Sequence, residues 1–547
     1  MTKEDVAMLL HIRKELQAEK GEIESSWKEI VAYMGQSYAS WGNSTKPQQH
    51  KVSPRITDTT AADASATLAD GVAGYAFNRS MAWFDFEIEK IDPPKEDDDV
   101  AVDKESVEKA LQSIRPVAYE MFARSRFYIE SRSFIRSCAD LGTAIMYFYF
   151  DKKKNKPVFK TLHLKDVEMM VDHDGEVDTL FRDLFFTKRE AKTFFGEDNL
   201  PKDIKECEDD QKVFPFIQFI SLATRWDFDV QGKGDWLNVY LFDGEELPLK
   251  EERLKDKPFA VWRWSQQIFG GTWGVDSPGL MCLPIIKFVN LLQEDLITLS
   301  ELVAKGHWKK TKGLAVNFKA GGVTELENGQ DFGFMGHQGD LSWLSEHINY
   351  YRRVIEQNYK VELFLILSQN IDRTKTATEV AGLETEKSAL MSSFFAQLGD
   401  EFLEPVIEWM FSQILVMAMP EDVDEDVLKM LTKLDVKIDF VSPMYRDQER
   451  NFKLMPTLQW LQDVLNLAGI NPNVLDRVNF DKIVELDHSL RGADATTLIK
   501  IGDAKKAREI RAKAQAQMQQ QGLNAQKLDE GLKAYDTLVN KAPKGAV

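Results

Sequence analysis

The chain has 547 residues and a formal charge of −19, because its 88 acidic residues outnumber its 69 basic residues. A protein that wraps nucleic acid over an exposed face usually carries a basic surface, so this balance excludes such a protein and allows only local contacts with nucleic acid. Because 43% of the residues are apolar and 11% are aromatic, the chain can bury a core, which excludes disorder over most of its length.

The three cysteines occur singly, at Cys138, Cys207 and Cys282. None forms a CxxC pair and their number is odd, which argues against a disulfide framework and against a zinc site. The first residues, "MTKEDVAMLLHIRKEL", lack the apolar centre of a signal peptide and predict an amphipathic helix. No apolar run reaches the roughly 18 residues that a membrane span needs. We therefore expect a soluble protein that is made in a reducing cytoplasm and has no membrane partner.

Helical and extended segments alternate in the first part of the chain. The apolar spacing predicts helices over residues 3–34, about 59–78 and 104–140. Between the second and third of these helices, "MAWFDFEIEKID" alternates like a strand, and "DPPKEDDDVAVDKES" is predicted to be an acidic surface loop.

From about Thr143 the apolar residues recur at every second position, which predicts strands. The stretches "DHDG" and "FDGEE" supply turn residues between some of them. The predicted fold class is therefore α+β, with one mostly antiparallel sheet carried by helices. The predicted strand segments are "AIMYFYFD", "KPVFKTLHL", "VEMMVDHDGEVDTLFRDLFFT", "FPFIQFISLATRWDF", "DWLNVYLFDGEELP" and "PFAVWRWSQ".

Helices return in the second half of the chain. The spacing predicts a helix from Pro284 to about Lys305, a short β-like insert after it, and another helix over residues 341–365. Residues 445–540 are predicted to be mainly helical.

A long helix is predicted from Ala377 toward Met419, and Pro405 is expected to kink it. Its start lies in "RTKTATEVAGLE", where Thr376 and Glu379 have the spacing of a capping box. In such a box each of the two side chains accepts a hydrogen bond from a free backbone N–H group at the start of the helix.

Two basic stretches stand out in this acidic chain. Arg373 and Lys375 directly precede the long helix. No acidic residue occurs between Leu302 and Thr324, whereas five lysines do: Lys305, Lys309, Lys310, Lys312 and Lys319. Lysines at a helix C-terminus suit the helix dipole and a solvated surface, and they also suit contact with nucleic acid. The residue types leave both interpretations open.

The sequence contains none of the motifs GxxxxGK(S/T), GxGxxG, HExxH or GxSxG. The nearest match to the last is "GVDSPG", in which the serine comes one place too late. In "DHDGEVD" the glycine of a calcium loop is misplaced and no glutamate closes the loop, which favours a hairpin turn. Only His163 and His173 share a neighbourhood among the histidines. We expect no catalytic residue, no metal and no cofactor; an enzyme with an unrecognised motif remains the alternative.

Three blocks of the chain resemble the head-to-tail connecting (portal) proteins of short-tailed bacteriophages. The first, residues 53–88, contains a helix crowded with small residues that leads into a Trp-Phe strand. The second, residues 261–295, has Arg-Trp before a Gly/Ser-Pro turn and then a helix with the pattern "LPxIKxxNxLxED". The third combines "RTKTATEV" with "EFLEPVIEWMFSQIL". One departure is "GGTWGVDSP", where the family more often has a Tyr-Gly pair before the Ser-Pro.

The resemblance implies a ring, generally of twelve subunits, around a channel through which double-stranded DNA is packaged and later ejected. The subunit would consist of a wing with N-terminal helices and an antiparallel sheet, a two-helix stem, a small clip insert, a tunnel loop, a long kinked wing helix and a helical crown. The implied ranges are wing 1–283, stem 284–306 and 341–365, clip 307–340, tunnel loop 366–376, wing helix 377–444, and crown with C-terminal tail 445–547.

The resemblance also implies roles for the basic and aromatic residues named above. Arg373 and Lys375 would line the DNA channel, and the lysines between residues 305 and 319 would face the channel or the terminase. Phe332 and Phe334 would lie in the clip between neighbouring subunits. Twelve copies would carry a formal charge of −228 (12 × −19), and an acidic channel with few basic rings lets DNA slide, because few counterions are released on contact.

The partners implied by the resemblance are other copies of the chain, double-stranded DNA, the major capsid and scaffold proteins, a separate terminase, and tail adaptor and nozzle proteins. The protein would lie at one vertex of the capsid, as a docking platform for terminase and tail. A capsid or scaffold component without a channel is a further alternative.

Overall fold

The computed structural model describes residues 1–34, 56–88, 104–266, 270–305, 307–317, 325–335, 341–362, 364, 394–417, 431, 436–440, 454–469, 472–491, 506, 508 and 510. The chain divides into two compact units, Met1–Met444 and Tyr445–Val547, and each is described by itself. Within the described residues, no helix is long and apolar enough to cross a membrane.

Four helices come from the N-terminal part of the first unit: α1 (Lys3–Tyr33), α2 (Thr60–Ala76), α3 (Lys104–Arg124) and α4 (Phe127–Leu141). The first two agree with the predicted bounds. The helix predicted over residues 104–140 is two helices instead, because Ser125 interrupts it. The Ser125 hydroxyl donates to the Phe122 carbonyl at 2.7 Å and accepts from the Phe127 N–H at 3.1 Å, so the side chain replaces the helical backbone bonds.

The predicted strands form two antiparallel sheets rather than one, and the α+β class is confirmed. Three strands make the first sheet in the order β3-β2-β9, and five make the second in the order β4-β5-β6-β7-β8. The strands of the first sheet are β2 (Thr143–Asp151), β3 (Lys156–Leu162) and β9 (Phe259–Arg263). Those of the second are β4 (Val167–Val171), β5 (Val177–Thr187), β6 (Val213–Leu222), β7 (Trp236–Leu241) and β8 (Lys250–Leu254). Single turns of 3₁₀ helix, η1 (Leu164–Asp166) and η2 (Ala223–Arg225), lie between strands.

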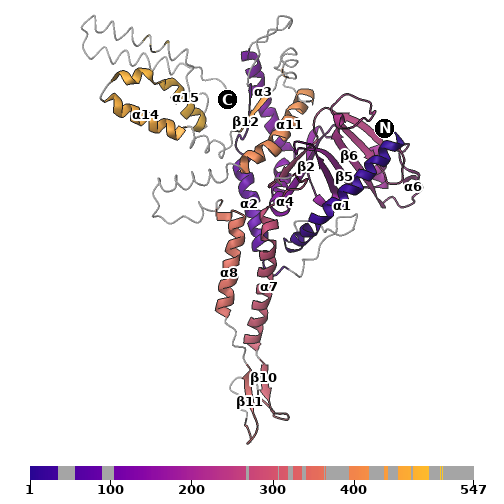
Figure 1. The fold of residues 1–547 in the computed structure, drawn as a ribbon, viewed down its shortest axis with the longest axis vertical. Coiled ribbons are helices and arrows are strands. Elements are labelled where there is room, and N and C mark those ends of the chain that lie inside the picture. The colour runs from indigo at the N-terminus through magenta and orange to yellow at the C-terminus, as the bar shows by residue number, and fades with distance from the viewer. Residues whose placement is uncertain are drawn as a thin grey trace. The chain divides into compact units, whose positions relative to one another are not determined.

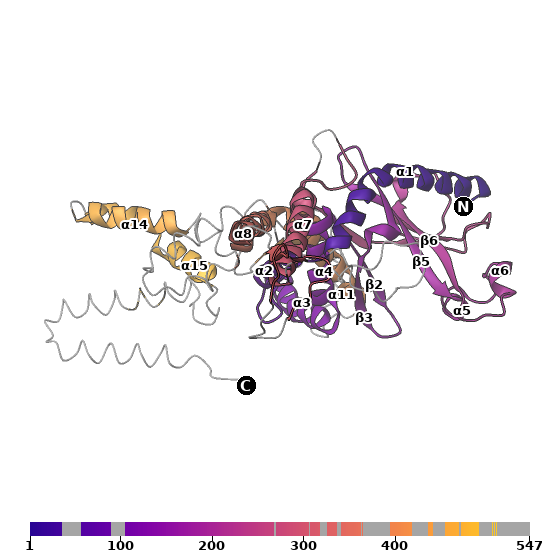
Figure 2. The ribbon, with the colours of Figure 1, turned by 90° about the horizontal axis from the view of Figure 1, so that it is seen from below.

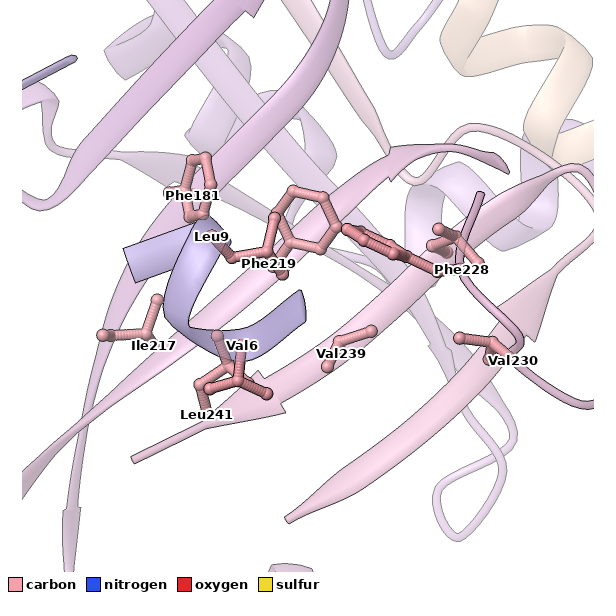
Figure 3. Close-up of a cluster of buried hydrophobic side chains, with 10 residues drawn as sticks. Val6, Leu9, Phe181, Ile217, Phe219, Phe228, Val230, Val239 and Leu241 are labelled. Atoms are coloured by element: carbon pink, nitrogen blue, oxygen red, sulfur yellow. The ribbon is translucent and has the colours of Figure 1, made fainter. Parts of the chain in front are cut away.

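The five-stranded sheet is covered on both faces. On one face, Val6 and Leu9 of α1 pack against apolar residues that include Phe181 and Phe219, as Figure 3 shows. On the other face, Phe216 packs with the short helices α5 (Lys188–Phe195) and α6 (Lys202–Lys205). This alternation along the strands gives the sheet a core on each side.

A helical hairpin follows the sheets. It consists of α7 (Pro278–Lys305) and α8 (Leu341–Asn358), and the antiparallel strands β10 (His307–Lys310) and β11 (Phe332–Met335) lie between them in sequence. The two helices run side by side in Figures 1 and 2, and the strand pair lies beyond one end of them in Figure 1.

Both helices of the hairpin differ from their predicted bounds. Helix α7 begins at Pro278 rather than Pro284, because Ser277 accepts from the Leu280 and Met281 N–H groups and Pro278 suits the first helical position. Helix α8 ends at Asn358 rather than at residue 365, because Lys360 adopts a left-handed backbone conformation with φ 56°.

Two segments complete the first unit. A π-helical turn, η3 (Gly399–Leu403), leads into α11 (Glu404–Met417), and Pro405 is the second residue of that helix. The hydrogen-bond pattern of a π-helical turn differs from that of an α-helix, so the missing N–H group of Pro405 is tolerated there. A kink was predicted at this position. Strand β1 (Asp85–Ile88) pairs antiparallel with the distant β12 (Val436–Asp439).

The second unit is helical in its described residues, in agreement with the prediction. It contains α14 (Met455–Ala468), η5 (Pro472–Arg477) and α15 (Phe480–Arg491).

Candidate functional site

The helical hairpin of α7 and α8 is attached to the rest of the first unit by a buried polar hub at Asn290. The Asn290 side-chain oxygen accepts from the backbone N–H groups of Thr57 at 2.8 Å and Asp58 at 3.0 Å, and its amide donates to the Ile286 carbonyl at 2.8 Å. The Asp58 carboxylate accepts from the Arg352 guanidinium of α8 at 2.8 Å. One cluster therefore fixes both helices to the segment that precedes α2.

The Gly/Ser-Pro turn before α7 packs backbone against backbone. A Cβ atom on Gly279 would lie 2.1 Å from the Asp140 carbonyl oxygen, and one on Gly274 would lie 2.0 Å from that of Gly142. Only glycine fits at these positions. Ser277 is fully buried, and its hydroxyl lies 3.5 Å from the Asp140 carbonyl. The motif "GVDSPG" thus joins α7 closely to the end of α4, and its serine is a helix cap.

The C-terminal end of α8 is also fixed on the end of α4. Tyr359 is fully buried, and its hydroxyl donates to the Asp140 carboxylate at 3.0 Å. Five residues later, the Phe364 ring occupies the space that a side chain on Gly71 of α2 would need, with Cδ1 2.3 Å from the position of a Cβ atom. The N-terminal part of α7 and the chain after α8 are therefore both fixed on helices α2 and α4.

The hairpin exposes many large apolar side chains. On α8, Trp343 is 57% exposed and Tyr350 is 61% exposed. On α7, Phe288 and Ile297 are exposed although they lie nine positions apart, which at 3.6 residues per turn places them on opposite sides of the helix. Further exposed apolar residues of α7 are Met281, Leu291 and Val303. Apolar surface of this extent marks an interaction site.

The strand pair β10–β11 contains the predicted clip residues. Lys309 forms an ion pair of 2.8 Å with Asp331, and the Lys310 ammonium donates to the Leu314 carbonyl at 3.1 Å. The stretch between Leu302 and Thr324 contains no acidic residue, but in the folded chain Asp331 compensates the charge of Lys309. Phe332 is half-buried, and Phe334 pairs with Trp308 through the backbone.

Three other lysines were predicted to contact the channel or the terminase. Lys312 is exposed in the turn after β10, and Lys305 is the last residue of α7. Lys319 lies outside the described residues, as do the predicted tunnel-loop residues Arg373 and Lys375 and the predicted cap, Thr376 and Glu379.

The described residues that follow the predicted tunnel loop are firmly packed. The Phe394 ring lies 5.2 Å from the Trp262 ring and 5.1 Å from the Trp264 ring. The Glu401 carboxylate accepts from the Arg263 N–H at 3.0 Å, and the Gln397 amide donates to the Arg263 carbonyl at 2.8 Å. The alternation of Trp262 and Trp264 predicted the strand "PFAVWRWSQ". Nothing in the sequence indicated that this strand packs against the segment that contains Phe394.

The groups with possible chemistry are used structurally. Asp172, His173 and Asp174 present ligand atoms within 4.8 Å of one another. However, this is the predicted hairpin turn, and the Asp172 carboxylate already accepts from the Asp174 and Glu176 N–H groups at 2.9 Å each. Burial raises the pKa of the Cys138 thiol well above its usual range and that of Cys282 to about 11, so both thiols stay protonated and are poor nucleophiles.

Comparison with known proteins identifies the family of the chain. The family described as "Bacteriophage head to tail connecting protein" matches residues 7–499. Two phage proteins are similar to the chain over nearly its full length. The "Portal protein" of Salmonella phage epsilon15 is 24% identical over 99% of this chain and 97% of its own length. The "Probable portal protein" of Bordetella phage BPP-1 is 24% identical over 96% of this chain and 94% of its own length. The chain belongs to the family of bacteriophage head to tail connecting proteins.

Proposed function

We propose that this protein is the phage portal protein: copies of the chain form a closed ring at one vertex of the capsid, and double-stranded DNA is packaged and ejected through its channel. Family membership and the names of two full-length relatives support the proposal. The structural observation that carries it is the helical hairpin of α7 and α8, which exposes apolar side chains on opposite sides of a helix.

A ring explains this exposure. In a cyclic assembly each subunit contacts two neighbours through two different surfaces, so an element between them can bury apolar side chains on both sides. Phe288 and Ile297, on opposite sides of α7, fit this arrangement. A component with a single partner would need only one such face.

The parts of the subunit are assigned as follows. Residues 1–283 and 377–444 form the wing. Residues 284–306 and 341–365, which contain most of α7 and all of α8, form the stem. Residues 307–340 form the clip, residues 366–376 form the tunnel loop, and residues 445–547 form the crown and C-terminal tail. The five-stranded sheet of the wing does not need a neighbour, because the chain covers both of its faces itself.

DNA contact is assigned to the tunnel loop. Arg373 and Lys375 form two basic rings in an otherwise acidic channel, and they touch phosphates without reading bases, so the contact is independent of sequence and weakened by salt. Lys305, Lys309, Lys310, Lys312 and Lys319 lie toward the terminase or the channel. The ion pair of Lys309 with Asp331 lowers the contribution of that lysine.

The protein performs no catalysis in this proposal. A separate terminase supplies the energy for packaging and docks on the clip, and tail adaptor and nozzle proteins, the major capsid protein and scaffold proteins are the other partners. The protein is made in the host cytoplasm and ends in the virion.

The mass of the purified assembly tests the proposal. A closed ring of twelve copies has a mass of about 750 kDa (12 × 62.6 kDa), and native mass spectrometry should find a ring of this size class. A stable monomer or dimer under conditions that favour assembly would contradict the proposal and favour an enzyme or a component without a channel.

The clip assignment has its own test. Replacing Phe332 and Phe334 together by Asp brings charge into a contact between subunits, which is costly without a partner charge. Rings should then fail to form while the subunit stays folded. Normal rings from this double variant, seen by negative-stain microscopy, would remove the clip assignment but leave the portal function standing.

A further inference from the structure

Arg182 and Lys160 are two neighbouring cations without a carboxylate partner. Arg182 of β5 is only 8% exposed, and its guanidinium carbon lies 4.7 Å from the centre of the Tyr147 ring. Lys160 of β3 is the direct cross-strand neighbour of Tyr147. Both cations therefore flank one ring, where the three-stranded and the five-stranded sheets meet. In the described part of the chain, neither side chain forms a hydrogen bond or an ion pair.

The surroundings disfavour both charges. Burial lowers the pKa of the Arg182 guanidinium, and burial together with the Arg182 charge lowers the pKa of Lys160. The acidic groups that act on Lys160 are Glu130 and Asp166. Glu130 already accepts from the Thr161 N–H at 3.0 Å, and Asp166 forms no ion pair with either cation. Two close cations in low dielectric are costly unless an anion compensates them.

The hydrogen bonds around Tyr147 have a fixed direction. The Asn238 amide nitrogen donates to the Glu252 carboxylate, so the Asn238 oxygen faces Gln218 and accepts from its amide nitrogen at 2.9 Å. The same Gln218 nitrogen lies 3.2 Å from the Tyr147 hydroxyl and 3.3 Å from that of Tyr240. The amide has two N–H groups for these three oxygens, so the Tyr147 hydroxyl lies in this network and keeps a proton that it can donate to another acceptor.

The site thus presents two cationic donors, a guanidinium and an ammonium, beside a phenolic hydroxyl that can donate, and the Asp166 carboxylate acts on both cations without an ion pair to either. We propose that Arg182, Lys160 and the Tyr147 hydroxyl bind a small oxyanion of the phosphate or sulfate type. A guanidinium offers parallel N–H groups that match two oxygens of such an anion. Solvent reaches the site, because Lys160 is exposed and the neighbouring Tyr149 is 43% exposed. The proposal is independent of ring formation and of DNA passage.

Thermal unfolding of the full-length protein tests the site. Phosphate or sulfate, added in place of chloride at equal ionic strength, should raise the Tm of the wild type in a saturable way, because a ligand that binds only the folded state stabilises it. Lys160→Met should abolish the saturable rise, and so should Arg182→Met. Lys156→Met is the matched control, because Lys156 points to the same face of β3 four residues away, and it should respond like the wild type.

Each other outcome overturns the proposal. No saturable rise in the wild type would mean that water alone solvates the two cations. An equal rise in the wild type, Lys160→Met and Lys156→Met would be the general effect of excluded salts on stability. A rise with acetate and none with phosphate would indicate a carboxylate site instead. If Arg182→Met fails to fold, the exposed Lys160 still decides the question.

Discussion

The five-stranded sheet and the helical hairpin of α7 and α8 bury their apolar residues in different ways. In the sheet, Phe181 and Phe219 are fully buried by α1 of the same chain. In the hairpin, Trp343 and Tyr350 are more than half exposed. Burial of apolar surface is the main stabilising term in folding and in association alike. The sheet therefore completes its core within one chain, whereas the exposed side chains of the hairpin are what the proposed ring would bury.

The two regions also differ in how they are fixed. The sheet faces are held by apolar contacts, to which Arg13 of α1 adds ion pairs with the sheet. The hairpin is held by directional bonds at Asn290, between Asp58 and Arg352, and between Tyr359 and Asp140. Hydrogen bonds depend steeply on geometry, so this attachment sets the direction of the hairpin, as the proposed contact with a neighbouring copy requires.

The largest effect is expected in the sheet core. Phe219→Ala removes a fully buried ring that lies 5.0 Å from the Phe181 ring, and it should lower the free energy of unfolding by about 3–5 kcal/mol. Urea unfolding of the subunit measures this. Phe194→Ala, at a ring that is 45% exposed, is the control and should cost clearly less; equal costs would contradict a self-contained core.

The hairpin should show the opposite behaviour. Replacing Trp343 and Tyr350 together by Ser should change the free energy of unfolding of the subunit by no more than about 0.5 kcal/mol, because both side chains are exposed. The same variant should lose the ring in native mass spectrometry. Glu346→Gln, an exposed change on the same helix, should keep it. Wild-type assembly by the double variant would show that these aromatic rings do not meet a neighbour.

The hub at Asn290 should matter next. Asn290→Ala leaves the Thr57 and Asp58 N–H groups without their acceptor, at a cost of about 1–3 kcal/mol. Hydrogen exchange should speed up at residues 57 and 58. Asn358→Ala, which loses only an exposed bond to Val354 within α8, serves as the control. Unchanged exchange in the first variant would show that the hub does not hold the hairpin.

Two glycines of α2 offer a smaller and sharper test. Ala at either position gains helix propensity of up to about 1 kcal/mol over Gly. At Gly74 nothing lies within 4 Å of an added Cβ atom, whereas at Gly71 the Phe364 ring lies 2.3 Å away. Gly74→Ala should therefore stabilise the protein and Gly71→Ala should destabilise it, since overpacking costs about 1–3 kcal/mol. Stabilisation by both, in thermal unfolding, would argue against the position of Phe364.

The smallest effect is a pH dependence at the contact of α1 with the sheet. Burial raises the pKa of the Asp183 carboxyl from 3.8 to about 6, against the lowering effect of Arg13. Between about pH 4 and 6 the folded state thus binds more protons than the unfolded state, so the free energy of unfolding falls as pH rises through this window. Asp183→Asn should remove this part of the slope in urea unfolding at a series of pH values. An unchanged slope would contradict the raised pKa.

The sequence predicted the positions of helices and strands better than it predicted which strands pair with one another. Helical and two-residue periods located α1, α2 and most strands, because these periods follow from local backbone geometry. Strand pairing is not local, which is why one sheet was expected and two were found. The apolar spacing predicted the start of α7 at Pro284, whereas the helix begins at Pro278, which suits the first helical position and follows a serine cap.

The candidate site was predictable only in part. The sequence located the helical hairpin and its strand pair, and the residues predicted to precede the long helix lie outside the described residues. It could not show that Asp331 neutralises Lys309 or that Asn290 holds Asp58, since these partners lie far apart in the chain. The sequence also did not predict that Trp343 is exposed, because apolar residues on a helix are buried in most proteins.

The central claim is that the hairpin of α7 and α8 completes its core between neighbouring copies around a channel. Electron cryomicroscopy of the purified assembly tests it most directly. The account predicts a closed ring in which the hairpins stand side by side around the central opening, with Trp343 and Tyr350 buried against the next copy. A ring with the hairpins at its outer rim and these two side chains in solvent, or an assembly without a central opening, would contradict it.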